Sequence, residues 1–364
     1  MMKCQLVRTI AAFAALGLVL IGCTQASPAA APTGSPTSGT PPRAPTAVKA
    51  AEPTKAPATP VPAVTFPEKG KSITFMVPFA AGGGSDLLVR ALTPFLEKDL
   101  GVPIVNVAKP GAATQVAMTE LVKAKPDGYT ISIATLITTP VTYLDPERKA
   151  SYGRKDLLTV ANLVVEDMVL NVKADSPWKT VKDLVDAAKA APGKIRIGTT
   201  GLMGIGHLAA LALQQEAGTE FAFVHFEGSG PATTALLGGH VEVTCTGAGA
   251  AFAHVKSGAL RVVGYLDSQQ SKFFPDVKPI TEQGYKVVMP AAYGVVAPAR
   301  TPKAVVDRLA SALKAAVENK EVDERLAEIA FAPRFMDSAK FSAYWDEAEA
   351  RAAPLIKLAK AQAQ

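Results

Sequence analysis

The chain has 364 residues, 48% of them hydrophobic, which is enough for two globular domains with buried cores. Its formal net charge is +6, but residues 1–66 alone contribute +4, leaving +2 for everything from residue 67 onward. Because a nucleic-acid-binding protein would carry a basic stripe with interleaved aromatic residues on its folded part, and residues 67–364 contain no such stretch, the charge pattern excludes nucleic acid as a partner.

The N-terminus predicts an export signal followed by a tether. Residues 1–22 combine Lys3 and Arg8 with a short apolar core and end in Leu-Ile-Gly before Cys23, which resembles a bacterial lipobox. We therefore expect cleavage after residue 22 and lipidation of Cys23, with an ordinary signal peptidase site as the alternative. Residues 23–66 are dominated by Ala, Pro, Thr and Ser, a composition typical of a disordered tether or of a mucin-like stalk.

The apolar run at residues 73–79 leads into a glycine loop and then a helical pattern. Three consecutive glycines let backbone amides approach a ligand closely, and a helix N-terminus favours an anion. The loop lacks the lysine and hydroxyl of a Walker motif, and Leu87 stands where the dinucleotide pattern needs a third glycine or alanine, so a nucleotide is not the expected ligand. Ser85 and Asp86 fit either a ligand contact or a helix cap. The predicted ligand residues of this loop are Phe79, Ala80, Gly82, Gly83, Gly84, Ser85 and Asp86.

Strand and helix patterns alternate along the rest of the first half. Strands are predicted at 102–107, 129–134 and 163–172, with helices at 112–123 and 181–190, which indicates parallel βαβ units. Thr135 follows a strand at the edge where ligands bind in open α/β sheets, although an ordinary strand-ending threonine explains it equally well.

The second half repeats this alternation. The predicted strands and helices are 194–197, 207–217, 221–225, 231–237, 241–244 and 261–265, then a returning strand at 287–297 and a C-terminal region that is mostly helical from Thr301 through 358. The strands at 194–197, 221–225 and 241–244 open into loops of small residues. One of these holds Gly228 and Ser229, which we interpret as a binding loop because Glu227 and Pro231 break the nucleophile-elbow pattern. The sequence therefore predicts an α/β protein of two domains joined by crossing strands, with a cleft between them.

Five short motifs occur in order and at characteristic separations. They are Val-Pro-Phe at 77–79, Lys-Pro-Gly-Ala at 109–112, Pro-Asp-Gly-Tyr-Thr at 126–130, Leu-Leu-Gly-Gly-His-Val at 236–241 and Gly-Val-Val-Ala-Pro-Ala-Arg-Thr-Pro at 294–302. Together they resemble the substrate-binding proteins of tripartite tricarboxylate transporters, the Bug or TctC family. The resemblance implies a type II-like periplasmic-binding-protein fold of two Rossmann-like lobes, here residues 67–168 plus 291–364 and residues 169–290.

The resemblance also implies a function and further site residues. Such a receptor binds a small organic carboxylate mainly through backbone amides and delivers it to the large and small permease subunits of the transporter. The family's loops correspond here to residues 79–86 and 110–115 in one lobe and to residues 199–201 in the other. This adds the predicted ligand residues Thr114, Gln115, Thr199, Thr200, Gly201 and His207.

Several positions depart from the family pattern. Leu202, Met203 and Ile205 replace small polar residues, which makes the pocket edge more apolar, and Thr246, also a predicted ligand residue, replaces an aspartate. We expect an aromatic or aliphatic mono- or dicarboxylate in preference to citrate.

Two other classes of protein, a secreted hydrolase and a ligand-sensing module, are alternatives to a transport receptor. A secreted hydrolase would use Ser85 or Ser229 as nucleophile, yet no His or Lys stands at a recognised spacing from either serine. A ligand-sensing module for a membrane signalling partner would show the same sequence features. Only Cys245 remains after the signal and Cys23, and the four histidines are scattered, so no disulfide or zinc site is expected. We expect no catalytic residue, metal or cofactor, a monomer, and an extracytoplasmic location with membrane attachment through lipidated Cys23 alone.

Overall fold

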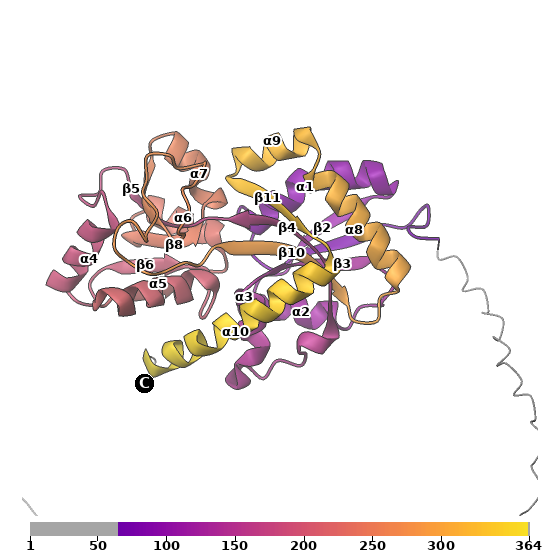
Figure 1. Cartoon of the computed structure of the whole chain (residues 1–364), viewed down its shortest axis with the longest axis horizontal. Coiled ribbons are helices and arrows are strands. Elements are labelled where there is room, and N and C mark those ends of the chain that lie inside the picture. The colour runs from indigo at the N-terminus through magenta and orange to yellow at the C-terminus, as the bar shows by residue number, and fades with distance from the viewer. Residues whose placement is uncertain (1–64, 363–364) are drawn as a thin grey trace, which may run out of the picture. The chain divides into compact units, whose positions relative to one another are not determined.

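The structure is a computed structural model that describes residues 65–362, so the predicted signal, Cys23 and most of the tether lie outside the described residues. The described strands form two sheets (Figure 1). The first has the order β11-β4-β10-β3-β1-β2, with bounds Ile73–Val77 (β1), Ile104–Ala108 (β2), Thr130–Thr135 (β3), Leu157–Glu166 (β4), Ala291–Pro298 (β10) and Phe331–Met336 (β11). The second has the order β7-β6-β8-β5-β9, with bounds Met168–Lys173 (β5), Arg196–Thr199 (β6), Ala222–His225 (β7), Val243–Gly247 (β8) and Leu260–Tyr265 (β9).

Each sheet is parallel in part and contains antiparallel strands: β10 and the edge strand β11 in the first, and β5 in the second. β1 pairs in parallel with β2 and β3, whereas β10 pairs antiparallel with β3 and β4. In the second sheet β6 pairs in parallel with β7 and β8, whereas β5 pairs antiparallel with β8 and β9. Every residue of β10 is buried, as expected of a central strand covered on both faces.

Helices cover both sheets. Those of the first sheet are Gly84–Leu100 (α1), Gln115–Leu121 (α2), Thr138–Leu144 (α3), Lys303–Val317 (α8), Lys320–Glu328 (α9) and Ser338–Gln362 (α10); those of the second are Val181–Ala190 (α4), Ile205–Ala217 (α5), Ser229–Leu237 (α6) and Gly249–Lys256 (α7). Short 3₁₀ helices span Pro146–Arg148 (η1) and Arg154–Asp156 (η2). We call residues 65–166 and 291–362 lobe 1, and residues 168–290 lobe 2.

Local signals explain several helix boundaries. The Thr180 hydroxyl accepts a hydrogen bond from the Asp183 N–H at 3.1 Å, and the Asp183 carboxylate accepts one from the Thr180 N–H at 3.0 Å. This is the capping box that the sequence predicts for the start of α4. Helix α1 ends at Leu100 and is capped by Gly101, whose φ of 70° a glycine adopts without strain.

The crossing between the lobes differs from the sequence prediction. The apolar run at 163–172 is not one strand: β4 ends at Glu166, Asp167 intervenes, and β5 begins in the other sheet. The predicted strand at 287–297 begins later, at Ala291. Helices α3 and α7 were not predicted, and neither was β11, which interrupts the predicted C-terminal helical region.

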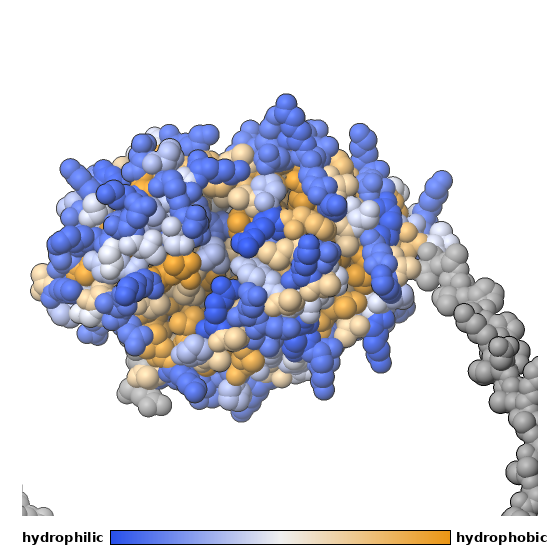
Figure 2. Space-filling view, viewed as in Figure 1, coloured by the Kyte–Doolittle hydropathy of each residue, from blue (hydrophilic) through white to orange (hydrophobic). Residues whose placement is uncertain are grey.

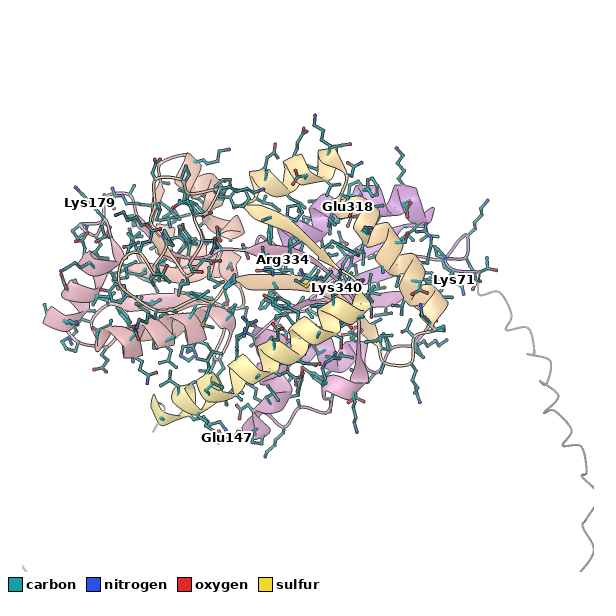
Figure 3. The ribbon with its side chains drawn as sticks, in the orientation of Figure 1. Lys71, Glu147, Lys179, Glu318, Arg334 and Lys340 are labelled. Atoms are coloured by element: carbon teal, nitrogen blue, oxygen red, sulfur yellow. The ribbon has the colours of Figure 1, made fainter. Side chains whose placement is uncertain are left out.

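Helix α10 links the lobes at one side of the molecule. It packs against α3 and β4 of lobe 1 and also contacts α5 of lobe 2, as Figure 1 shows for the yellow helix. Two of its own side chains, Phe341 and Trp345, are fully buried. Near its C-terminal end, Lys360 forms ion pairs with Asp145 at 2.6 Å and with Glu147 at 2.8 Å; Glu147 is labelled in Figure 3. These contacts attach the end of α10 to lobe 1.

The surface is largely polar. Figure 2 shows hydrophilic side chains over both lobes on this face, with hydrophobic ones gathered in small areas between them. Within residues 65–362, no helix combines the length and the hydropathy that crossing a bilayer requires.

Candidate functional site

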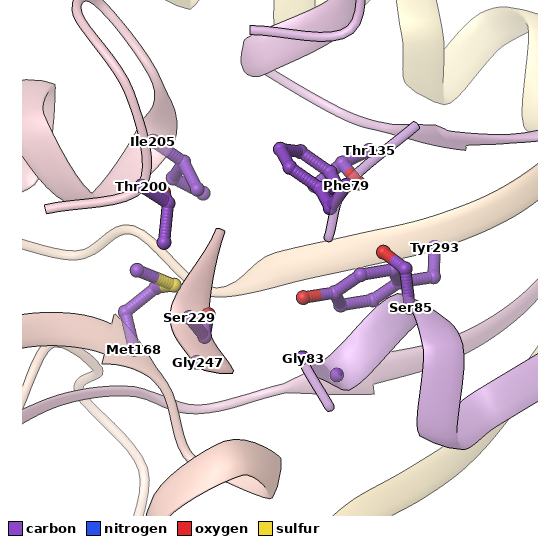
Figure 4. A pocket seen from close by; sticks show the side chains of 11 residues that line it. Phe79, Gly83, Ser85, Thr135, Met168, Thr200, Ile205, Ser229, Gly247 and Tyr293 are labelled. Atoms are coloured by element: carbon purple, nitrogen blue, oxygen red, sulfur yellow. The ribbon is translucent and has the colours of Figure 1, made fainter. Parts of the chain in front are cut away.

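A small cavity lies between the lobes, with room for about one water-sized molecule (Figure 4). Lobe 1 and lobe 2 both line it, and its residues are Phe79, Gly83, Gly84, Ser85, Thr135, Met168, Thr200, Ile205, Ser229, Gly247 and Tyr293. Seven of these were predicted as ligand residues, and Ile205 was expected at the pocket edge. Met168, Gly247 and Tyr293 were missed, because each lies on a strand whose end faces the cavity only after the two sheets are in place.

Two helix N-termini face each other across this cavity. Helix α1 begins after Gly83 in lobe 1, and helix α6 begins after Gly228 in lobe 2. A Cβ atom placed on Gly83 would lie 3.6 Å from the backbone nitrogens of both Ser229 and Gly230. On α6, Gly230 allows this close approach because it has no side chain: a Cβ atom there would lie only 2.9 Å from the Ala81 carbonyl oxygen. The positive ends of two helix dipoles therefore meet at one place.

The first backbone N–H groups of these helices are available to a ligand. Among residues 65–362, no protein acceptor bonds the N–H of Gly84 or Ser85 in α1, or of Ser229 or Gly230 in α6. The first turn of a helix leaves such donors without an intrahelical partner, and an anion is the ligand that satisfies them best.

Hydroxyl groups complete the polar lining. The Thr135 side chain is 2% exposed, and its Oγ1 has no hydrogen-bond partner within the described part of the chain. A buried hydroxyl without a partner is costly, which indicates a place for a ligand or water. Phe79, Met168 and Ile205 supply apolar surface beside it. None of the residues lining the cavity carries a formal charge.

Several hydrogen bonds join the lobes around the cavity. The Ala80 N–H donates to the Glu227 carbonyl at 2.9 Å, and the Ile205 N–H donates to the Thr138 hydroxyl at 3.0 Å. Farther out, Arg148 Nη2 donates to the Leu202 carbonyl at 2.5 Å. The lobes are thus closed on each other.

A buried carboxyl group lies directly behind the cavity. Glu166, the last residue of β4, is 1% exposed; its Oε1 accepts a hydrogen bond from the Gly249 N–H at 2.7 Å, and its Oε2 is hydrogen-bonded to the Tyr293 hydroxyl. Burial raises the pKa of Glu166 to about 7, against the lowering effect of these two hydrogen bonds. Sequence reasoning missed Glu166; the available signal was an acidic Glu-Asp pair inside an otherwise apolar run.

Three of the predicted lobe 1 residues have roles within the protein. Asp86 accepts hydrogen bonds from the Gly82 N–H at 2.9 Å and from Arg90 at 3.0 Å, which fixes the glycine loop. Thr114 is fully buried, and its hydroxyl meets that of Thr139 at 3.4 Å. Gln115 Nε2 donates to the Arg148 carbonyl at 3.0 Å.

Some of the predicted ligand residues of lobe 2 form hydrogen bonds within the protein, and others have no partner. The Thr199 hydroxyl is hydrogen-bonded to His225 Nδ1 at 2.8 Å, and His207 Nδ1 accepts from the Met203 N–H at 2.9 Å. Burial and the neighbouring His225 lower the pKa of His207 to about 3, so this ring is neutral at physiological pH. Thr246 is fully buried beside the cavity-lining Gly247, with its hydroxyl unpaired among the described residues.

Gly201 and Gln115 line a second hollow, at the outer edge of the interlobe contact. Its other residues include Arg148, Leu202 and Lys360. A Cβ on Gly201 would lie 3.5 Å from the Cβ of Ala113, so the lobes also touch here.

The described residues offer no group of three or more His, Cys, Asp or Glu side chains placed to hold a metal ion. Cys245 is buried as a free thiol, and burial raises its pKa to about 12, so it is not a reactive thiolate at neutral pH.

Comparison with known proteins decides the family. The family model described as TctC, tripartite tricarboxylate transporter family receptor, matches residues 88–360. The chain belongs to this TctC family. A relative from Cupriavidus necator, named UPF0065 protein in gbd 5'region, is 33% identical over 302 residues, covering 82% of this chain and 90% of the relative.

Solved structures of similar proteins agree with the TctC assignment. A structure titled as a periplasmic transporter superposes with a TM-score of 0.76 at 30% identity, covering 79% of this chain and 97% of that one. MatC from Rhodopseudomonas palustris, solved with bound malate, gives a TM-score of 0.73 at 25% identity, covering 79% of this chain and all of that one. The predicted two-lobed periplasmic-binding-protein fold is confirmed, and this protein is a TctC-family solute-binding receptor.

Proposed function

We propose that the cavity of this TctC-family receptor binds a small organic carboxylate and that closure of the lobes captures it for delivery to a membrane permease. The observation that carries the proposal is the pair of opposed helix N-termini, α1 and α6, whose first N–H groups have no acceptor among the described residues. The malate bound in MatC, a similar protein, supports a carboxylate as the class of ligand.

The lining favours a ligand of low charge. Backbone dipoles and hydroxyl groups stabilise one carboxylate, but no cationic side chain lines the cavity to offset the three charges of citrate. Phe79, Met168 and Ile205 favour an aliphatic or aromatic body. The expected ligands are therefore mono- and dicarboxylates.

Closure follows from the geometry. A ligand carboxylate that bonds both helix N-termini interacts fully with them only when the lobes are together, so it shifts the equilibrium toward the closed form. Binding and release require no chemical step. Within the described residues, no His, Lys or Asp side chain is hydrogen-bonded to the hydroxyl of Ser85 or Ser229, which also favours a receptor over a hydrolase.

Isothermal titration calorimetry tests the proposal with a panel of malate, succinate, adipate and benzoate against citrate and glycine. We expect at least one of the first four to bind and to raise the melting temperature, with citrate and glycine weaker. Binding of citrate or glycine alone would overturn the ligand class, and binding of none of the six would overturn the assignment of the cavity.

The cellular context is a further part of the proposal. We propose large and small permease subunits as partners, a monomeric receptor, and attachment to the membrane through lipidated Cys23. Mass spectrometry of the mature N-terminus tests the anchor: a diacylglyceryl cysteine at position 23 supports it, and an unmodified N-terminus elsewhere contradicts it. Co-purification of permease subunits with the carboxylate-loaded receptor tests the partners.

A further inference from the structure

We propose that Glu166 is a proton-binding residue of the ligand site, which takes up a proton from solvent when a carboxylate enters the cavity, so that the receptor binds anion and proton together. The inference rests on the proposed function and adds a role for a buried side chain that does not itself line the cavity.

The carboxyl group of Glu166 lies directly behind two cavity-lining glycines. A Cβ atom on Gly84 would lie 3.0 Å from Oε1 and 3.1 Å from Oε2, and a Cβ on Gly247 would lie 2.1 Å from Oε2. A third cavity residue, Tyr293, is hydrogen-bonded to Oε2 through its hydroxyl group. In Figure 4 this hydroxyl points toward the side of the cavity where Met168, Ser229 and Gly247 lie. Three lining residues from three different elements therefore contact the same carboxyl group.

Glu166 lies next to the N-terminus of α1 and bonds the N-terminus of α7. Gly84 is the first residue of α1, whose N–H groups face the cavity, and Gly249 is the first residue of α7, whose N–H bonds Oε1. An ionised Glu166 is thus an internal anion at the site where an external one is expected. Two carboxylates this close in a buried environment repel each other, and the usual outcome is that one of them takes up a proton.

Few other charged groups face Glu166. The titratable neighbours are Tyr293 on β10 and the adjacent Asp167. The other elements packed against Glu166 contribute residues that do not titrate: Gly84 on α1, Gly249 on α7, Gly247 on β8 and Phe331 on β11. Asp167 raises the pKa of Glu166, while the Tyr293 and Gly249 hydrogen bonds lower it. No Lys, Arg or His contributes, so no cation is present to keep Glu166 ionised once a second anion arrives.

The consequence is a pH dependence with a defined sign. Burial already places the pKa of Glu166 near 7 in the empty receptor, and a bound carboxylate raises it further. Below about pH 6, Glu166 is protonated in both the empty and the ligand-bound receptor, so its titration does not affect the affinity. Above about pH 7, binding must bring a proton with it, and the association constant falls by up to tenfold per pH unit.

The experiment measures proton uptake by isothermal titration calorimetry of the whole mature protein. The tightest-binding probe among malate, succinate, adipate and benzoate is titrated at pH 5.5, 7 and 8, at each pH in two non-phosphate buffers that hold that pH and whose ionisation enthalpies differ. For the wild type we expect proton uptake close to zero at pH 5.5 and approaching one per ligand at pH 8. In E166Q, a neutral residue of the same shape, we expect no uptake and a flat pH profile.

Two further variants keep the test decisive even where E166Q does not fold. Y293F removes a hydrogen bond that favours ionised Glu166, so the fall in affinity should begin at a higher pH than in the wild type. The control D167N removes the adjacent carboxylate, which bonds the Ser271 hydroxyl at 2.5 Å; it should retain proton uptake with a lower midpoint.

Each outcome separates this inference from the proposed function. Absence of binding by all four probes at pH 5.5 would refute both. Binding without proton uptake at any pH, or uptake that persists in E166Q, would refute the role of Glu166 and leave the carboxylate site standing. An unmoved midpoint in Y293F would count against the role of Glu166 in the same way.

Discussion

Replacement of Gly83 by aspartate should abolish carboxylate binding while the fold remains intact. Gly83 precedes α1 with a φ of −87°, which any residue adopts, so a side chain causes no backbone strain there. A Cβ at this position would lie 3.5 Å from the Ala80 carbonyl oxygen and 3.6 Å from the nitrogens of Ser229 and Gly230. These are ordinary contact distances, so the new carboxylate would occupy the space between the two helix N-termini.

The size of the effect follows from charge repulsion. Two unit charges about 4 Å apart repel by about 4 kcal/mol in a partly solvated protein environment, which corresponds to a loss of several hundred-fold in affinity. Two matched variants separate charge from volume. Asparagine has the shape of aspartate without its charge and should lose much less affinity, and alanine should bind nearly as the wild type does.

Calorimetric titration of the three variants with the tightest-binding panel carboxylate measures these effects, and circular dichroism confirms the fold. Wild-type affinity in G83D would remove the glycine loop from the site. An equal loss in G83N and G83D would show that volume, and not anion recognition, explains the result.

Three further predictions follow from the same structure. The fold raises the pKa of Glu166 to about 7, so the contribution of this residue to stability is full below about pH 4.5 and is lost as the pH rises through 7. At pH 8, E166Q should therefore recover roughly 3 kcal/mol of unfolding free energy, measured by urea denaturation. A steep pH dependence of stability that persists in E166Q would contradict this. Arg148 donates a hydrogen bond to the Leu202 carbonyl across the lobes, so R148A should weaken carboxylate affinity about tenfold or more. The control R154A loses hydrogen bonds only within lobe 1 and should keep its affinity. Equal affinities in the two variants would show that Arg148 does not stabilise the closed form. The pKa of His207 is lowered to about 3, so its ring nitrogens should show no titration between pH 5 and 7 in ¹⁵N NMR spectra, and a transition in that range would place His207 in a more solvated site.

The sequence was sufficient to predict β1 and α1 because their signals are local. The apolar run, the glycine loop and the following helix are consecutive in the chain, and β1 and α1 form there. The returning strand β10 and helix α8 were also recognisable, from an apolar stretch and from Thr301-Pro302 before the helix.

Elements that depend on pairing between distant segments were missed. The continuous apolar pattern at 163–172 conceals the change of sheet at Asp167, since both β4 and β5 are fully or nearly fully buried. Strand β11 contains Pro333 and pairs only at the edge of the first sheet, where no local pattern predicts it. Helix α3 follows Ile137, whose positive φ of 75° has no sequence signal.

The candidate site shows the same division. Gly83, Ser85 and Ser229 were predicted because glycine loops before helices carry an intrinsic signal. Tyr293 and Glu166 were not, because their positions beside the cavity arise from the antiparallel insertion of β10 between β3 and β4. Thr199 and His207, also predicted at the ligand, are hydrogen-bonded to His225 and to the Met203 N–H within lobe 2.

A crystal structure of the receptor with a bound panel carboxylate tests the central claim most directly. The account predicts one carboxylate group between the N-termini of α1 and α6, with its oxygens within hydrogen-bond distance of the N–H groups of Ser85 and Ser229 and of the Thr135 hydroxyl. A carboxylate held elsewhere, such as beside Arg148 in the outer hollow, with those N–H groups bonded to the protein's own oxygens, would contradict it.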